Sequence, residues 1–325
     1  MTNTTDKRYL DAEEEKNFIS NKVVKNNFFI SRYKKLVDDF ELINVKERVL
    51  RINNLKVDEK QLVKRLRKKE VKLGKIPFLK FAYKYDADFS LGSTPEFLLG
   101  YYYLQGLASQ IVSEVLSPEE KDIVLDMASA PGSKTTHLSQ LMNNKGKIVA
   151  IDLNKDRLVS VRNNCERLGI LNVTFVRKDA RFVGDFGRKF SKILLDAPCS
   201  GNYCSEKDWF NKRTIDGVKD NVRLQRELLT SAYKVLEEGG ELVYSTCSLE
   251  PEEDELIIDW LLDKFNDLEL LKIDLSIGDD GITEFKGKKL NPELKKCKRF
   301  WPHKTGTEGF FIAKLRKKTT TIGNK

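Results

Sequence analysis

From Asp122 onward, short hydrophobic runs alternate with longer amphipathic stretches, and this alternation limits the possible folds more than any other feature. Each hydrophobic run is typical of a buried strand, and the amphipathic stretches are typical of helices. The seven expected strands are DIVLDM, KIVAID, VTFVRKD, KILLDAP, ELVYSTC, LELLKI and GFFIAKL. The expected helices are KTTHLSQLMNN, DRLVSVRNNCERLG, RLQRELLTSAYKVLEE and EEDELIIDWLLDKF. Elements in this order predict an α/β fold with a doubly wound, mostly parallel seven-stranded sheet.

The first third of the chain follows a different pattern. A strand in VLRINNLKV, a basic helix in VDEKQLVKRLRKKEV and a strand in FLKFAYKY predict a small α+β module. Helical spacing before this module predicts an N-terminal helical extension, through Tyr33, Leu36, Val37, Phe40 and Leu42. The predicted division is a helical extension at 1–48, the small module at 49–115, the large domain at 116–318 and a disordered tail at 319–325.

Basic charge is concentrated in two segments rather than spread along the chain. The net charge is +9, whereas residues 51–84 alone carry +9 and residues 286–318 carry +10. The rest of the chain must therefore sum to −10. Two basic segments beside an acidic middle indicate a polyanionic partner such as RNA. A lysine-rich solvated surface explains the same charge equally well.

Composition excludes several other classes of protein. No run approaches 18 apolar residues, and the start of the sequence has no apolar signal-peptide core, so we expect no membrane span and a cytoplasmic location. The five cysteines lie between Cys165 and Cys297 without a C-x-x-C pair. This spacing predicts neither a disulfide framework nor a metal site, and it fits a reducing compartment.

The loop after the first strand of the large domain predicts a cofactor site. It comprises Ala128, Ser129, Ala130, Pro131, Gly132, Ser133 and Lys134. Gly132 lets backbone amides approach a ligand, and the following helix offers its positive N-terminus. Asp152 ends the second strand, where an acid binds ribose hydroxyls, and Asp179 ends the third strand, near an adenine edge. We also expect Arg157 and Asp196 among the cofactor contacts.

The kind of cofactor follows from the pattern of this loop. It lacks the G-x-G-x-x-G spacing of NAD sites and the Walker spacing of ATP sites. S-adenosylmethionine carries no phosphate, and an Ala-Pro-Gly turn suits it. A helix cap or surface acid explains any one of the aspartates alone. Acids at four strand ends (Asp126, Asp152, Asp179 and Asp196) together favour an adenosyl cofactor.

Two cysteines follow neighbouring predicted strands. Cys199 lies just beyond the strand that ends at Asp196, and Cys247 lies just beyond Ser245. Ligands of open α/β sheets gather at the carboxyl ends of the strands, so we expect both thiols in one crevice. Either cysteine alone would be read as a buried structural thiol. Two thiols beside a nucleotide-type cofactor indicate covalent chemistry on an electrophilic ring.

The motifs DMASAPGSKTTHL, DAPCSG and YSTCS, in this order, closely resemble those of the Sun-domain RNA cytosine-5 methyltransferases. The resemblance runs from Leu50 to Lys318 and includes RINNLK, SLGSTPEFLLGYYYLQ and WPHKTGTEGFFIAKL. It implies a Rossmann-like, S-adenosylmethionine-dependent methyltransferase domain at 116–318. The basic helix and the Phe/Tyr-rich strands of the module at 49–115 favour RNA binding, although burial of the aromatic side chains explains the same strands. Because no additional RNA-binding domain is evident, the chain looks most like the compact archaeal tRNA enzymes. It departs from the family's usual Cys-Ala-Ala-Pro-Gly-Gly-Lys loop, with Ser133 in place of a glycine.

The resemblance also implies roles for the two cysteines, and the positions of Asp196 and Lys134 suggest roles for these residues. Cys247 is the expected nucleophile that adds to carbon 6 of cytosine, and Cys199 is the partner needed to release the product. Asp196 is expected to hydrogen-bond the ring at N3 and the amino group. Lys134 is expected to help lower the pKa of the attacking thiol.

Several alternatives remain open on the sequence alone. The expected substrate is tRNA, with rRNA as the alternative, and the chain is expected to act as a monomer. A DNA cytosine methyltransferase would instead use the cysteine of the Pro-Cys pair, Cys199. A non-catalytic RNA-binding protein is disfavoured by the combination of Cys199, Cys247, Asp196 and Lys134.

Overall fold

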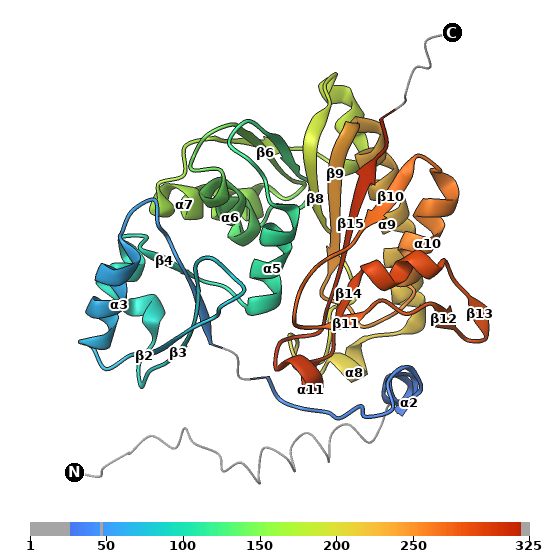
Figure 1. Cartoon of the computed structure of the whole chain (residues 1–325), viewed down its shortest axis with the longest axis horizontal. Coiled ribbons are helices and arrows are strands. Elements are labelled where there is room, and N and C mark those ends of the chain that lie inside the picture. Colours follow the sequence, from blue (N-terminus) through green and yellow to red (C-terminus); the bar gives the residue numbers. More distant parts are fainter. Residues whose placement is uncertain (1–26, 46–47, 320–325) are drawn as a thin grey trace.

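The computed structural model describes residues 27–45 and 48–319 of the chain (Figure 1). Predictions for residues 1–26 and for the tail at 320–325 therefore lie outside the described residues. Two sheets carry the structure, one of four strands in the N-terminal part and one of nine strands in the remainder. No helix within the described ranges has the length and apolar character that crossing a membrane requires.

The large sheet has the strand order β11-β14-β15-β9-β8-β5-β6-β7, and β10 also pairs with β15. The strands β7, β6, β5, β8 and β9 are parallel to one another, whereas β15 runs antiparallel to β9. The bounds are β5 Ile123–Asp126, β6 Lys147–Asp152, β7 Val173–Arg177, β8 Phe190–Asp196, β9 Leu236–Thr246, β10 Leu268–Leu271, β11 Asp279–Asp280, β14 Lys298–Phe300 and β15 Phe310–Lys317. The prediction of a doubly wound, mostly parallel sheet is confirmed.

The predicted number of seven strands is wrong, because the sheet has nine. The extra strands, β11 and β14, have two and three residues and are too short to give a hydrophobic pattern. β14 and β10 pair with successive stretches of the same edge of β15, at 310–312 and 314–317. The seven predicted strands are all present, and the two short ones lengthen the antiparallel edge.

The predicted end of one helix is also wrong. The helix expected to run to Glu238 is α9, Ile215–Val235, and Glu237 and Glu238 belong to strand β9. Leu236 pairs with Phe190 of β8, and burial of this hydrophobic side chain draws the start of the strand back along the chain. The sequence suggested Gly239 as the residue that ends the helix. In the structure its φ of 75° instead accommodates an irregularity within strand β9.

Helices cover both faces of the large sheet, as expected for strands that are apolar on both sides. Neighbouring residues of β5 show this, because Val124 packs with one helical layer and Leu125 with the other. The first layer contains α5 Leu107–Leu116 and α6 Ser133–Leu141, beside α7 Lys155–Leu168. The second contains α9 and α10 Glu255–Lys264 (Figure 1). Short helices complete this part at α8 Trp209–Lys212, α11 Pro302–Thr305, η2 Ala180–Phe186 and η3 Pro292–Lys296, with a hairpin of β12 Glu284–Phe285 and β13 Lys288–Lys289.

The small module is an antiparallel sheet of order β2-β3-β1-β4 with one helix against it. Its elements are β1 Val49–Ile52, α3 Glu59–Arg67, β2 Lys72–Lys75, β3 Ala82–Asp86, η1 Leu91–Ser93, α4 Pro95–Leu98 and β4 Tyr102–Leu104. The Asp58 carboxylate accepts the Gln61 N–H at 3.0 Å and so begins α3. Leu62 and Leu66 of α3 are buried against the sheet. Helix α5, which the predicted boundary at residue 115 assigned to this module, packs on the large sheet.

The described part of the N-terminal extension is one helix followed by an extended segment. Helix α2 covers Asn27–Leu36, so the prediction that helical spacing continues through Phe40 and Leu42 is wrong. These side chains are instead held by tertiary packing, because Phe40 joins a cluster with Trp209, Trp301 and Leu249. The segment thus lies against the loops that follow β8 and β9.

Candidate active site

The ends of β8 and β9 bring the two predicted thiols together. Asp196 and Ser245 are partners in the parallel register of these strands, so the loops that leave them start side by side. Cys199 lies three residues beyond Asp196, and Cys247 lies two residues beyond Ser245. The two Sγ atoms are 3.3 Å apart, and both cysteines are free thiols. The expectation that the two thiols lie together at the ends of neighbouring strands is confirmed.

The loop that carries Cys199 is fixed by a buried carboxylate. Glu253 accepts the backbone N–H of Ser200 at 3.0 Å and its hydroxyl at 2.6 Å. Gln225 of α9 donates to the carbonyl oxygen of Pro198 at 2.9 Å. Glu253 is fully buried, and this burial raises its pKa. These contacts hold the backbone on both sides of the Cys199 thiol.

A second set of contacts holds Cys247. The amide of Asn202 donates to the Cys247 carbonyl at 2.8 Å and to the Gly309 carbonyl at 3.0 Å. One residue earlier, the Thr246 hydroxyl donates to Asp254 at 2.6 Å. Asp254 in turn pairs with the buried Arg299 guanidinium at 3.0 Å. The position of Cys247 therefore depends on β8, β9 and β15 at once.

A lysine from the loop Ala128–Lys134 reaches the same strand ends. Lys134 Nζ lies 2.7 Å from Asp196 Oδ2, and the Ser245 hydroxyl donates to the other carboxylate oxygen at 2.7 Å. Burial lowers the pKa of Lys134, but the charge and hydrogen bond of Asp196 and the nearby Cys247 outweigh it, and the pKa lies above its ordinary value. The ammonium is therefore charged and stands beside both Asp196 and Cys247.

The two thiols differ in their electrostatic surroundings. The hydrogen bond with Cys247, followed by burial and the charge of the neighbouring sulfur, raises the pKa of Cys199 well above its ordinary value. Cys199 therefore keeps its proton and can donate a hydrogen bond to the Cys247 sulfur. Two sulfurs at this distance cannot both be charged, since like charges in a dry site repel strongly.

The loop Ala128–Lys134 forms the turn between β5 and α6, as predicted. Gly132 has φ of 102°, and a Cβ there would lie 3.1 Å from the backbone of Val161 in α7. The positive φ and the tight space both favour glycine at this position. Ser129 holds the other side, because its N–H and its hydroxyl both donate to the Ile151 carbonyl at 2.9 Å. The loop is thus packed between β6 and α7.

Two strand-end acids retain hydrogen-bonding capacity that suits the predicted cofactor. Oδ1 of Asp126 is buried and has no hydrogen-bond partner among the described residues, and burial raises the pKa of this carboxyl to about 6. Asp152, on the adjacent strand, accepts the Asn154 N–H at 2.9 Å through one oxygen. Its other oxygen lies 3.8 Å from Arg157, whose guanidinium also lies 3.4 Å from the Ala130 carbonyl. Such acceptors fit a ligand that supplies amino and hydroxyl donors, as S-adenosylmethionine does.

Asp179 is engaged within the protein more fully than the sequence suggested. It begins η2 by accepting the Arg181 N–H at 2.9 Å. The Arg181 guanidinium also donates to it, at 3.0 Å and 2.7 Å. The hydrogen bonds from Arg181 lower the pKa of Asp179. An adenine contact at this carboxylate would have to compete with a bidentate arginine.

Four further residues belong to the site but were not predicted as site residues from the sequence. Ser245 could have been found from the strand register, because it is the parallel partner of Asp196. The others act through contacts across long separations in the chain, and they are Asn202, Glu253 and Glu308. Burial raises the pKa of Glu308, and its charge interacts with those of Lys134 and Asp196. Within the described ranges, no group of three histidine, cysteine or acidic side chains could hold a metal ion.

The fold is that of the Rossmann-like, S-adenosylmethionine-dependent methyltransferases. The chain belongs to the family described as 16S rRNA methyltransferase RsmB/F, whose model matches residues 113–316. The N-terminal domain of 16S rRNA methyltransferase RsmF matches residues 26–107.

The similar proteins act on different RNAs, according to their names. The chain is 46% identical over 228 residues to a tRNA (cytosine(72)-C(5))-methyltransferase of Pyrococcus horikoshii, covering 70% of this chain and 55% of that protein. It is 37% identical to the tRNA (cytosine(49)-C(5))-methyltransferase of Pyrococcus abyssi, covering 95% of this chain and 99% of that protein. A human 28S rRNA (cytosine(4447)-C(5))-methyltransferase is 40% identical, but the match covers 84% of this chain and only 34% of that protein. The chain thus spans less than two thirds of several relatives it matches.

Solved structures agree with this assignment. A methyltransferase homologue from Pyrococcus horikoshii superimposes with a TM-score of 0.82 at 39% identity, covering 95% of this chain and 100% of that one. NSun6 from Pyrococcus horikoshii, solved with SFG, gives a TM-score of 0.76 at 30% identity, covering 95% of this chain and 96% of that one.

Proposed function

We propose that this protein methylates carbon 5 of cytosine in RNA, with tRNA as the substrate and a covalent Cys247–cytosine adduct as the intermediate. The observation that carries the proposal is the 3.3 Å approach of two free thiols beside the Lys134–Asp196 ion pair. A methyltransferase that acts on an oxygen or an amino nitrogen needs no such pair, because those atoms attack the methyl group directly.

Cytosine needs covalent help because its carbon 5 is a poor nucleophile. When the Cys247 sulfur bonds to carbon 6, the ring becomes an enamine and carbon 5 can attack an electrophile. Bound S-adenosylmethionine supplies a methyl group activated by its sulfonium. Lys134 places a positive charge close to Cys247, where it can stabilise the negative charge that develops as the sulfur attacks. Asp196, held by Lys134 and Ser245, would accept a hydrogen bond from the amino group of the ring, and one from N3 once N3 is protonated as the thiol adds.

Cys199 acts in the second half of the reaction. After methyl transfer, carbon 5 must lose a proton and the bond between Cys247 and carbon 6 must break. The hydrogen bond to the Cys247 sulfur is the main cause of the raised pKa of Cys199. Once that sulfur is bonded to carbon it carries no charge, so this cause weakens and Cys199 can ionise. The resulting thiolate accepts the carbon-5 proton, and elimination then restores Cys247.

The choice of tRNA over rRNA rests on the extent of the similarity. The tRNA enzyme of Pyrococcus abyssi is matched over 99% of its length, whereas the human rRNA enzyme is matched over 34%. Methylation of rRNA is the second candidate function, because several similar proteins carry that name. We further propose that the protein is a cytoplasmic monomer.

Bisulfite sequencing of tRNA and rRNA from a strain that lacks the gene tests this function. We expect one or more tRNA cytosines to lose protection from conversion, and purified protein with S-adenosylmethionine to restore it on the unmodified transcript. Loss of protection in rRNA alone would favour the second candidate. Unchanged patterns in both RNAs would contradict the proposal.

Asp152 gives a direct test of cofactor binding. Replacing it with alanine removes the acceptor proposed for the ribose hydroxyls, and an unsatisfied polar partner costs about 1–3 kcal/mol. Calorimetry with S-adenosylmethionine should therefore show weaker binding by that amount for Asp152→Ala. Affinity equal to that of the unchanged protein would contradict the role of Asp152.

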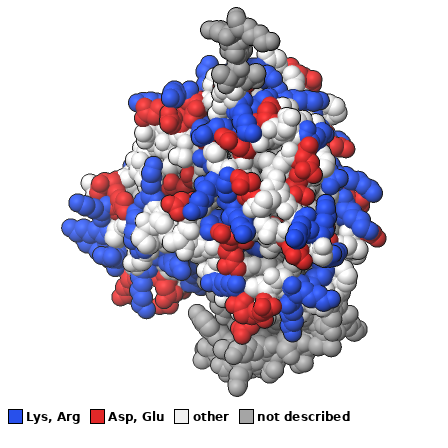
Figure 2. Space-filling view, turned by 45° about the vertical axis from the view of Figure 1, so that its right-hand side comes forward, with Lys and Arg blue, Asp and Glu red and all other residues white. Residues whose placement is uncertain are grey.

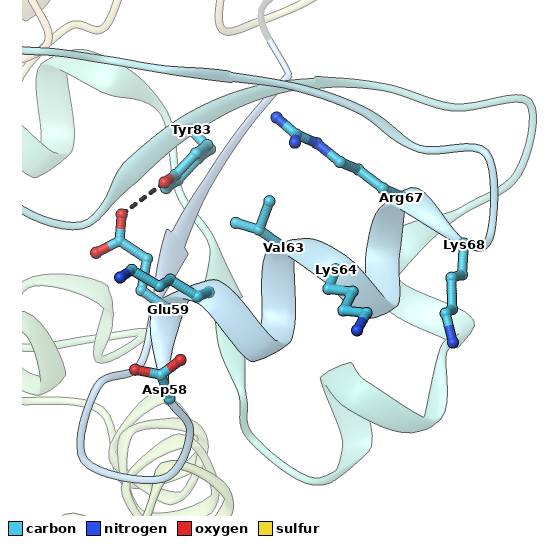
Figure 3. A pocket seen from close by; sticks show the side chains of 8 residues that line it. Asp58, Glu59, Val63, Lys64, Arg67, Lys68 and Tyr83 are labelled. Atoms are coloured by element: carbon cyan, nitrogen blue, oxygen red, sulfur yellow. Dashed lines mark hydrogen bonds between the residues drawn. The ribbon is translucent and has the colours of Figure 1, made fainter.

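We propose helix α3 of the small module as the main RNA-binding surface, because its cations are free to meet phosphates. Lys60, Lys64, Arg67 and Lys68 are exposed, and none of them forms an ion pair with another residue that the structure describes. They line a pocket between α3 and β3, with Tyr83 on its far side (Figure 3).

The second basic segment is less available than its charge of +10 suggests. Arg299 is buried against Asp254 and Glu255, and Lys314 and Arg316 pair with Glu241 at 3.0 Å and 2.7 Å. Acidic side chains also lie among the lysines and arginines over the surface in Figure 2. Much of this charge therefore supports the fold.

RNA affinity should accordingly depend on salt and on α3. Each phosphate that a lysine or arginine neutralises releases counterions, so affinity should fall steeply between low and high salt. Charge reversal at Arg65, Arg67 and Lys68 should weaken binding and flatten this dependence, as measured by filter binding across a salt series. Reversal at Lys289 and Lys318, which are exposed and lie outside the small module, serves as a control and should have a smaller effect. A salt-independent constant, or equal binding after reversal on α3, would contradict the assignment.

A further inference from the structure

A completely buried guanidinium joins the small module to the helix that follows the cofactor loop. Arg51 lies on β1, its exposed fraction is 1%, and its side chain crosses to α6 of the large domain. It belongs to the RINNLK segment, for which neither the cofactor site nor the thiol pair gives a reason. Burial of an arginine is costly, so its contacts should explain why it is present.

Arg51 binds oxygens of both the first and the last turn of α6. It donates to the Ser133 carbonyl at 2.9 Å, the Thr136 hydroxyl at 2.8 Å and the Gln140 side chain at 3.0 Å. It also donates to Gln105 and lies 5.3 Å from the centre of the Tyr103 ring. These acceptors are neutral. Burial lowers the pKa of Arg51 to about 9, so the side chain remains charged at neutral pH.

The same segment binds the end of α7 through two other side chains. Asn53 donates to the carbonyls of Gly100 and Leu168, both at 2.8 Å. Lys56 donates to the carbonyls of Leu99 and Arg167, both at 2.9 Å. Arg51 therefore differs from its neighbours in the segment, because it alone contacts the first turn of α6.

That first turn carries the residue which links the cofactor loop to the thiols. Lys134 lies between Ser133 and Thr136, the two residues that Arg51 holds, and its Nζ reaches Asp196. A hydrophobic side chain at position 51 could fill the space but could not fix the Ser133 carbonyl. Arg51 thus fixes the end of the loop Ala128–Lys134 from outside the large domain.

We propose that Arg51 is a positioning residue through which the small module sets the conformation of the cofactor loop. The proposal rests on the function proposed above, since it assumes that this loop binds S-adenosylmethionine. A residue that merely joins two domains would affect folding stability and leave cofactor affinity unchanged.

The test compares Arg51→Lys with Asn53→Ala, which removes buried contacts of the same segment to α7. For each protein we would measure the melting temperature, S-adenosylmethionine affinity by calorimetry and RNA affinity by filter binding. Both variants should melt earlier than the unchanged protein. Arg51→Lys should weaken cofactor binding by about tenfold, because lysine cannot reach the three acceptors at once, whereas Asn53→Ala should change it by less than about twofold. RNA affinity should be retained in both.

A second variant keeps the test decisive if Arg51→Lys does not fold. Thr136→Val keeps the shape of the side chain but removes the hydrogen bond from Arg51 and the one that the hydroxyl donates to the Ser133 carbonyl at 3.1 Å, and it should weaken cofactor binding by about threefold. Cofactor affinity within twofold of the unchanged protein in both Arg51→Lys and Thr136→Val would overturn the proposal, as would an equal loss in Asn53→Ala. Failure of the unchanged protein to bind S-adenosylmethionine would instead contradict the proposed function.

Discussion

Replacing Cys247 with alanine is expected to abolish methyl transfer and to prevent any covalent complex with RNA. Without the sulfur that adds to carbon 6, carbon 5 remains a poor nucleophile, and the rate should fall by about 10³-fold or more. Transfer of labelled methyl groups to tRNA and a denaturing gel measure both outcomes in one experiment. Cofactor affinity should persist, because Cys247 lies at the end of β9 rather than in the loop Ala128–Lys134.

Cys199→Ala should behave in the opposite way on the same gel. Addition and methyl transfer should still occur, but the adduct should persist, so a denaturant-resistant protein–RNA complex should accumulate. Cys204→Ser is the matched control, because this cysteine lies five residues farther on and contacts the Ile43 carbonyl at 3.8 Å. It should show normal turnover and no trapped RNA. Trapping by Cys247→Ala in place of Cys199→Ala would reverse the roles and match the DNA cytosine methyltransferases.

Asp196→Asn is expected to lower the rate of methyl transfer by about 10²–10⁴-fold, the range for a residue that stabilises or transfers a proton at the reacting group. Asparagine keeps the shape and can still accept from Lys134, but it loses the charge that faces both Lys134 and the base. Single-turnover kinetics with saturating RNA and cofactor measure this step.

Ser245→Ala provides the control for Asp196→Asn. It removes one hydrogen bond to the carboxylate but keeps the charge, so its effect should be close to that of one lost hydrogen bond, about tenfold or less. A rate for Asp196→Asn that matches the Ser245→Ala rate would mean that Asp196 only supports Lys134. An unchanged rate in both variants would remove Asp196 from the chemistry.

The large sheet and the pair of thiols could be predicted because their signals are local in the sequence. Each parallel strand is a short apolar run that ends in an acid or a cysteine, and parallel strands place such ends at one edge. The strand ends at Asp196 and Ser245 therefore predicted the meeting of Cys199 and Cys247, which the structure confirms at 3.3 Å. The roles of these residues in catalysis remain predictions.

The parts that could not be predicted depend on contacts between distant segments. Phe40 continues the helical spacing of α2 but is held by Trp301, so tertiary packing decides its conformation. Glu238 follows a long amphipathic helix, yet pairing of Leu236 with β8 begins a strand before it. Arg51 resembles the exposed cations that follow it in the sequence. Only the placement of β1 against α6 shows that it is buried.

During synthesis, the large sheet can close the edge of β9 only after β15 has been made. β15 pairs with β9, with Phe311 opposite Thr246, and it lies between β9 and β10 in the sheet. Both β9 and β10 come before β15 in the chain. Until residues 310–317 leave the ribosome, β9 keeps an open edge, and β10 has no partner in the large sheet. The Asn202 amide, which donates to the carbonyls of both Cys247 and Gly309, also lacks its Gly309 partner until then. Until β15 is made, a nascent chain therefore lacks one of the contacts that hold the loop beside Cys247, and the open edge of β9 is available for pairing with other chains.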